Sequence, residues 1–304
     1  MLIKHPLIRD FSWTDLASLK ELIPNIWNTS SPDHPSNPQA LERYIKDGIA
    51  TATRKCILLT TQTTAIGYLF MTFEKPISRL ILEGGVHPQY RGHGLGKLLL
   101  NSGLEEGNRL AAQIINIPIT EQTKDLTNLL SSSGLKHVRT HWQMKLPKIP
   151  LITPELPEKF QLAYLLKGQE QILATLQNNC FQGSWGFSPN TSEQIHSALK
   201  YPGNYPNGIL ILLDNSQPVA YNWTLVIKTS SPITGIISMT GVLPKYRGLG
   251  LGKLIVTAGI KQLQEIGADS TSLTVDADNI PARELYLKIG FKRISQTFWY
   301  GKTM

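Results

Sequence analysis

The chain has 304 residues, of which 41% are hydrophobic and 17% are charged, and 30 basic against 22 acidic side chains give a net charge of +8. This composition excludes disordered, collagenous and coiled-coil chains, and the length allows two domains of ordinary size. No apolar run reaches the roughly 18 residues of a membrane span, and Met1 to Pro6 lacks a signal-peptide core, so we expect a cytoplasmic protein with no membrane partner.

The predicted elements follow one order in both halves of the chain: helices, then strands, then a glycine-rich turn into a long helix. In the first half, Ser12 to Asp15 predicts a capping box before a helix through Leu22. The remaining elements predicted there are a helix over 38–47, strands over 55–61, 65–73 and 79–86, a helix over 95–112 and a strand over 113–119. In the second half we expect helices over 169–176 and 192–199, strands over 208–213, 219–228 and 233–242, a helix over 251–266, a strand over 271–276, a helix over 279–289 and a strand over 291–300.

This order reflects an internal duplication. Residues 84–100, GGVHPQYRGHGLGKLLL, match residues 240–256, TGVLPKYRGLGLGKLIV, at 11 of 17 positions with an offset of 156. A proline-rich stretch, residues 146–160, reads as an extended connector between the copies. We therefore predict an N-terminal domain over 1–149 and a C-terminal domain over 150–304.

Each copy places a glycine-rich turn between a strand and a long helix. The turns are Arg91 to Lys97 and Arg247 to Lys253. Glycines let the backbone amides and the positive end of the helix face one point, which suits a pyrophosphate. The spacing excludes a Walker loop and the dinucleotide fingerprint. A turn that binds nothing is the alternative, and the repetition of the flanking Arg and Lys argues against it.

Two motifs together resemble the GNAT N-acetyltransferases. One is Arg-x-x-Gly-x-Gly after a strand that ends Val-x-Pro; the other is Asn279 to Phe291, similar to that family's closing pattern of Asn-x-x-Ala-x-x-Leu-Tyr followed by Gly-Phe. The tandem layout looks most like the mycothiol synthase branch. The resemblance implies two α/β domains, each a mixed, mostly antiparallel sheet flanked by helices, that use acetyl-CoA as acyl donor without a metal.

The resemblance also implies roles for individual residues. Tyr286 would protonate the departing thiolate, although its place on an apolar stripe also fits a core residue. Asn279 also fits a helix N-cap. Residues implied to contact acetyl-CoA in the C-terminal copy are Thr240, Gly241, Val242, Arg247, Gly248, Leu249, Gly250, Leu251, Gly252, Lys253, Asn279 and Ala282. Those implied in the N-terminal copy are Val86, Arg91, Gly92, Gly94, Gly96 and Lys97.

The copies differ at the closing motif. The offset places Thr123, Leu126 and Leu130 where the second copy has Asn279, Ala282 and Tyr286. The first copy therefore keeps the turn and lacks the proton donor, so we expect the C-terminal domain to perform the transfer. Whether the N-terminal domain binds CoA is left open.

No general base is evident. The strand over 233–242 has no carboxylate or histidine, and Ile236 falls near the place of an acidic substrate-contacting residue of mycothiol synthases, so we expect a different acceptor. Asp276, on the following strand, is the nearest alternative base, although it also fits a solvated aspartate at the end of a strand. A water relay would need no residue as base. Glu83, in the first copy, is a candidate base or a surface carboxylate. His196 and Trp185 are weaker candidates for an acceptor pocket.

Three functions follow from these residues. The first is acetyl transfer from acetyl-CoA to a primary amine of a small molecule or peptide by direct attack. The second is a catalytically silent CoA-binding or regulatory module. The third is nucleic-acid binding, which the even spread of charge argues against, with a basic excess of five in residues 1–150 and three in 151–304. With only Cys56 and Cys180, a closed cysteine zinc site is excluded and no metal is expected. Acceptor identity and oligomeric state stay open, and the tandem repeat is compatible with a monomer.

Overall fold

The computed structural model describes residues 6–27, 38–50, 53–61, 64–151, 153–227 and 232–304. It divides into two compact units, unit 1 with residues 1–139 and 298–304 and unit 2 with residues 140–297. Residue 228, the last of one predicted strand, residue 152 of the connector and the first five residues lie outside the described residues.

Unit 1 contains, in chain order, β1 (Pro6–Asp10), η1 (Trp13–Asp15), α1 (Leu16–Ile26), α2 (Pro38–Ala50), β2 (Arg54–Thr61), β3 (Thr64–Glu74), η2 (Lys75–Ile77), β4 (Arg79–Val86), η3 (Pro88–Tyr90), α3 (Leu95–Arg109), β5 (Ile114–Ile119) and α4 (Lys124–Ser132). Its strand order is β1-β2-β3-β4-β5-β12, where the last strand is β12 (Lys292–Thr303). Strands β4 and β5 pair in parallel, whereas β1–β2, β2–β3, β3–β4 and β5–β12 pair antiparallel.

Unit 2 begins within β6 (Lys136–Leu146) and continues with β7 (Phe160–Tyr164), α5 (Glu170–Phe181), α6 (Ser192–Ala198), β8 (Ile209–Asp214), β9 (Gln217–Ile227), β10 (Thr234–Val242), η4 (Pro244–Tyr246), α7 (Leu251–Glu265), β11 (Ser270–Asp276) and α8 (Ile280–Ile289). Its strand order is β6-β11-β10-β9-β8-β7, with β10 and β11 parallel. The predicted fold class, a mixed and mostly antiparallel sheet flanked by helices in each half, is confirmed.

Strands of both units bury residues on both faces, because helices cover each side of the sheet. In β2, Ile57 and Leu59 belong to the core under α3, while Leu58 belongs to the core under α1 and α2. In β9, Tyr221 and Trp223 face α5 and α6, and Ala220 faces α7. The runs of aliphatic residues that predicted these strands therefore reflect two cores per sheet.

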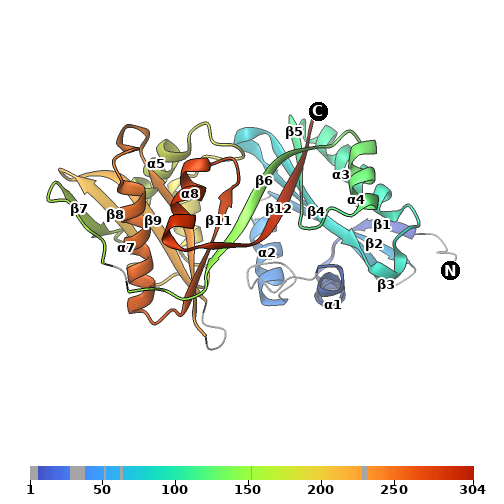
Figure 1. Ribbon diagram of the computed structural model, residues 1–304. Coiled ribbons are helices and arrows are strands. Elements are labelled where there is room, and N and C mark those ends of the chain that lie inside the picture. The colour runs from blue at the N-terminus through green and yellow to red at the C-terminus, as the bar shows by residue number, and fades with distance from the viewer. Residues whose placement is uncertain (1–5, 28–37, 51–52, 62–63, 152, 228–231) are drawn as a thin grey trace. The chain divides into compact units, whose positions relative to one another are not determined.

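The two long strands β6 and β12 exchange between the sequence copies. Six residue pairs, from Phe298 opposite Ile119 to Thr303 opposite Ile114, join the end of β12 to β5 (Figure 1). Residues 141–146 of β6 pair antiparallel with β11. The compact units therefore divide after residue 139 and again after 297, whereas the predicted boundary near 150 concerns only the sequence copies. In sequence terms that boundary stays a prediction.

The predicted elements correspond closely to those observed. The elements that the sequence reasoning did not name are β1, α4, β6, β7 and the four short 3-10 helices. The predicted capping box is confirmed, because the Ser12 amide donates to the Asp15 carboxylate at 2.8 Å at the start of η1, directly before α1.

Candidate active site

The glycine-rich turn of unit 2 points backbone amides outward at the start of α7. Gly248 has φ +80° and Gly250, the N-cap, has φ +77°, so both occupy the left-handed region that favours glycine. No side chain caps α7. Its first amides therefore remain available to an anion at the positive end of the helix dipole. Unit 1 repeats this geometry, with φ +80° at Gly92 and +77° at Gly94.

The arginine and lysine of each turn have different surroundings. Arg247 donates through Nε to the Val242 carbonyl at 3.2 Å and through Nη2 to the Cys180 carbonyl at 2.7 Å. Arg91 likewise donates through Nε to the Val86 carbonyl at 3.1 Å. These bonds tie each arginine to the end of the strand before the turn. Lys97 and Lys253 lie exposed on the first helical turn, where a cation faces an incoming anion.

A gap opens between the two parallel strands of unit 2. Pairing of β10 with β11 covers only Thr234–Ser270 to Ile237–Leu273, while β10 continues to Val242 and β11 to Asp276. Beyond Ile237 the strands no longer pair, and the gap ends at the glycine-rich turn. This geometry allows an extended ligand to lie between the strands with its phosphates at α7. In unit 1, β4 and β5 pair only from Arg79–Ile114 to Ile81–Asn116.

The strand before the turn differs between the units. In β10 the register with β9 shifts between Ile237 and Met239, so that Ser238 is an extra residue. In β4 the register with β3 is continuous from Arg79 to Val86. A bulge turns a backbone amide away from the ladder and bends the strand. In unit 2 the bulge therefore changes the direction of the backbone where the gap begins. The corresponding strand of unit 1 has no such bulge.

Tyr286 lies beside this gap, on α8. It is 6% exposed in a core that includes Leu273 and Val275 of β11, and its ring packs edge-to-face on Phe291 at 5.8 Å between centroids. Its hydroxyl makes no hydrogen bond with any residue that the structure describes. Burial raises the pKa of Tyr286 to about 12, so the phenol stays protonated at neutral pH. The hydroxyl oxygen itself is not fully enclosed, so this phenol can donate a hydrogen bond to a ligand in the gap.

The other residues of the closing motif stabilise the start of α8. Asn279 is the N-cap, and its Oδ1 accepts a hydrogen bond from the Ala282 amide at 3.3 Å. Asp276 ends β11, and its Oδ1 accepts from the Asp278 amide at 3.0 Å. The N-cap reading of Asn279 is therefore confirmed, while its contact with a cofactor stays a prediction.

Unit 1 has a helix at the corresponding place but no phenol. Thr123 caps α4 by accepting from the Leu126 amide at 3.4 Å, and Leu130 is 2% exposed in the core. Glu83 accepts a hydrogen bond from the Tyr44 hydroxyl at 2.7 Å. Burial is the main cause that raises the pKa of Tyr44, so this hydroxyl remains a donor to Glu83.

The two weaker candidates, His196 and Trp185, contact different residues. His196 is half exposed and its Nδ1 lies 3.2 Å from Glu170 Oε1, a hydrogen-bonding contact between α6 and α5. The Trp185 ring instead contacts His141 of β6, at 5.7 Å between centroids and nearly perpendicular. The sequence reasoning missed His141 and Gln143 because it named no strand over 136–146. The only local signal is the alternation of apolar Trp142, Met144 and Leu146.

Within the described parts of the chain, no group of three or more His, Cys, Asp or Glu side chains is placed to hold a metal ion. None of the helices there is both long and apolar enough to cross a membrane.

Comparisons with known proteins agree with this geometry. Residues 170–291 match the model of the acetyltransferase (GNAT) family. Two proteins named mycothiol acetyltransferase are similar in sequence. The one from Pseudarthrobacter chlorophenolicus is 30% identical over 75% of this chain and 72% of that protein. The one from Thermobispora bispora is 29% identical over 88% of this chain and 90% of that protein.

Solved structures share the fold over nearly the whole chain. A GCN5-related N-acetyltransferase from Sphaerobacter thermophilus has a TM-score of 0.75 at 20% identity, covering 98% of this chain and 95% of that one. A tandem GNAT protein from the clavulanic acid biosynthesis pathway has a TM-score of 0.73 at 13% identity, covering 98% of both chains. The chain belongs to the acetyltransferase (GNAT) family and is an acetyl-CoA-dependent N-acetyltransferase with two GNAT-like units.

Proposed function

We propose that unit 2 transfers the acetyl group of acetyl-CoA to a primary amine of a small molecule by direct attack, and that unit 1 does not catalyse transfer. The observation that carries this proposal is Tyr286, a largely buried tyrosine whose hydroxyl has no hydrogen-bond partner among the described residues, beside a strand gap that ends at a glycine-rich turn. Unit 1 has the gap and the turn, but leucine at the position of the phenol.

In this proposal the pyrophosphate binds the amides of residues 248–253 and Lys253, and the pantetheine arm lies along Thr240 to Val242. Amides turned outward by the β10 bulge stabilise the negative charge that develops on the carbonyl oxygen during attack. The bond from carbon to sulfur breaks, and Tyr286 donates its proton to the departing thiolate. Neither a metal nor a covalent enzyme intermediate is needed.

The acceptor is proposed as a primary amine other than the mycothiol precursor. The sequence relatives are named for mycothiol acetylation. The acidic residue expected in β10 by that resemblance is replaced by Ile236, which is half-buried. A panel of small amines that includes the mycothiol precursor tests this, since the precursor should not be the preferred acceptor. We also propose a cytoplasmic location, which the two unpaired cysteines support.

Tyr286→Phe is the decisive variant. Loss of the proton donor should lower kcat for amine-dependent thiol release by about 100-fold or more, while acetyl-CoA binding measured by calorimetry stays within threefold. The matched control is Tyr300→Phe, since Tyr300 is also 6% exposed and its hydroxyl accepts from Gln122 Nε2 at 3.1 Å in unit 1. That variant should keep kcat. Equal rates for Tyr286→Phe and wild type would refute the role of Tyr286.

A further inference from the structure

Strand β6 brings side chains of the first sequence copy into unit 2. Its register places His141 opposite Asp276 and Gln143 opposite Thr274. Directly opposed residues of antiparallel strands point to the same face, with Cβ atoms about 5 Å apart. The Thr274 hydroxyl donates to Gln143 Oε1 at 2.8 Å, which confirms this pairing of side chains. A polar row of two pairs therefore follows the last residues of β11.

This row lies on the face of the sheet away from α7 and α8. Leu273 and Val275 alternate with Thr274 and Asp276 along β11, and both pack into the core with Tyr286. On the row's own face, the Trp185 ring from the segment after α5 contacts His141 at 5.7 Å between centroids. His141, Trp185 and Asp276 are all half-buried, so part of each residue is exposed to solvent.

The row begins where the gap between β10 and β11 begins. Pairing ends at Leu273, so Thr274 is the first residue of β11 that borders the gap, and Asp276 lies about 10 Å along the strand from Leu273. Helices α7 and α8 cover the opposite face through the core around Tyr286. An amine that attacks an acyl group in the gap must therefore approach from the face of Thr274, Asp276 and His141.

We infer that His141 is the general base for the acceptor amine in unit 2, with Asp276 as its positioning residue and Gln143 as a hydrogen-bond donor to the acceptor. This inference rests on the proposed function. It supplies the base that β10 lacks, and it assigns that base to a strand of the first sequence copy. Because Gln143 Oε1 already accepts from Thr274, its Nε2 amide is directed to other partners, such as an acceptor oxygen.

The acceptor ammonium loses two protons in this step, one to His141 and one that restores Tyr286. The neutral imidazole of His141 removes one proton from the ammonium of the acceptor, directly or through one water. The amine nitrogen then forms a bond to the acetyl carbon, and the bond from that carbon to the CoA sulfur breaks. The thiolate takes the Tyr286 proton, and the second proton lost by nitrogen restores the phenol. The imidazolium releases its proton to solvent.

The charges that face His141 come from two strands. Asp276 lies opposite on β11. On β6, the alternation of side chains places Arg139, two residues before His141, and Lys145, four residues after it, on the same face. The segment over 182–190, which carries Trp185, has no acidic or basic side chain. Arg283 and Arg293 contact the ring of Trp142, which points to the other face. The Asp276 carboxylate lies directly across from the imidazole and favours the imidazolium formed during the reaction, whereas the cations of Arg139 and Lys145 on the same strand oppose it.

The experiment measures kcat/KM for the amine as a function of pH in the full-length chain. Wild type should lose activity at low pH as the imidazole becomes protonated, because the imidazolium cannot accept a proton from the amine. His141→Asn should lower kcat/KM by about 100-fold and remove this acid limb. Asp276→Asn should move the limb to lower pH. Added imidazole should restore part of the activity of His141→Ala.

The matched control is His137→Asn. His137 lies four residues earlier on β6, and its ring contacts Phe298 and Tyr300 in unit 1. That variant should keep the wild-type profile. If His141→Asn retains the acid limb and more than a third of kcat/KM, the inference is overturned while the proposed function stands. If His141→Asn no longer binds acetyl-CoA, an unchanged acid limb in Asp276→Asn overturns it instead. A wild-type chain without amine-dependent thiol release overturns both.

Discussion

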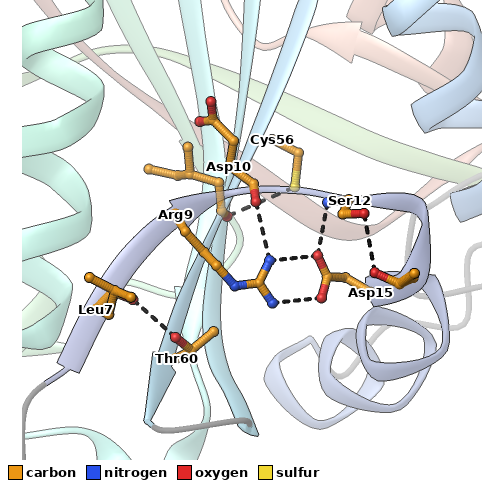
Figure 2. Close-up of polar contacts among 9 residues, drawn as sticks. Leu7, Arg9, Asp10, Ser12, Asp15, Cys56 and Thr60 are labelled. Carbon is orange, nitrogen blue, oxygen red and sulfur yellow. Dashed lines mark hydrogen bonds and ion pairs between the residues drawn. The ribbon is translucent and has the colours of Figure 1, made fainter.

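The Asp15 carboxylate joins three segments at the start of unit 1. Arg9 of β1 donates to both of its oxygens, at 2.6 and 2.7 Å, and the Ser12 amide donates at 2.8 Å (Figure 2). The hydrogen bonds from Arg9 are the main cause that lowers the pKa of Asp15, and the Ser12 amide adds to the effect. The side chain of Asp15 is 12% exposed, so solvent screens these bonds only in part.

We predict that Asp15→Asn lowers the free energy of unfolding by about 1–2 kcal/mol at neutral pH, because charge-assisted hydrogen bonds are lost. The folded pKa is lower than the unfolded one, so this stabilisation is present above about pH 4 and disappears as the pH falls further through the folded pKa. Urea titrations between pH 3 and 7 should therefore show a shallower acid limb in the variant. Asp10→Asn is the control, since the Asp10 side chain is 72% exposed and should leave the midpoint nearly unchanged. A variant as stable as wild type at pH 7 would contradict the assignment.

At the scale of elements, substitution in the glycine-rich turn is limited by backbone conformation and not by steric room for a side chain. A Cβ at Gly250 would meet nothing within 4 Å, but φ +77° strains any other residue. Gly250→Ala should cost about 1–2 kcal/mol of strain or move the α7 amides. We expect acetyl-CoA to bind about tenfold more weakly, as measured by calorimetry.

Gly267→Ala is the matched control for this turn. Gly267 has φ +87° and equally open surroundings, but it lies beyond the last turn of α7. The variant should lose similar stability and keep the acetyl-CoA affinity. Equal loss of affinity in both variants would show that strain alone, and not the direction of the α7 amides, weakens binding.

The sequence predicted the elements whose determinants are local. The capping box at Ser12 spans four residues, and the glycines of each turn lie within a single loop, so both are visible in the sequence. Strand β6 was missed because its partners are far along the chain: Gln143 bonds to Thr274, 131 residues later. The β10 bulge was missed too, since it depends on register with β9, which no local pattern fixes. The sequence therefore indicated the glycine-rich turn and the closing motif of the candidate site. It did not indicate the parts that depend on β6 and on the β10 bulge.

At the scale of the whole molecule, the chain passes from unit 1 through unit 2 and returns to unit 1. A chain ending at residue 297 would leave one side of β5 without its six paired residues. We predict that amides of β5 then exchange with solvent at least tenfold faster, because edge strands lose ladder hydrogen bonds. Removing Met304 alone is the control, since it deletes one hydrogen bond, to the Gln113 carbonyl. If the β5 amides of the shortened chain are as protected as those of the full chain, the pairing of β12 with β5 is contradicted.

The same path has a consequence for the history of the duplication. Each unit includes a strand from the other sequence copy. Deleting the first copy would therefore also remove residues 140–146 from unit 2, where they form the strand beside β11. Selection for the activity of unit 2, which has the Tyr286 phenol, would therefore also retain the first copy, which has Leu130 at that position. Retention of the first copy requires no catalytic activity in unit 1.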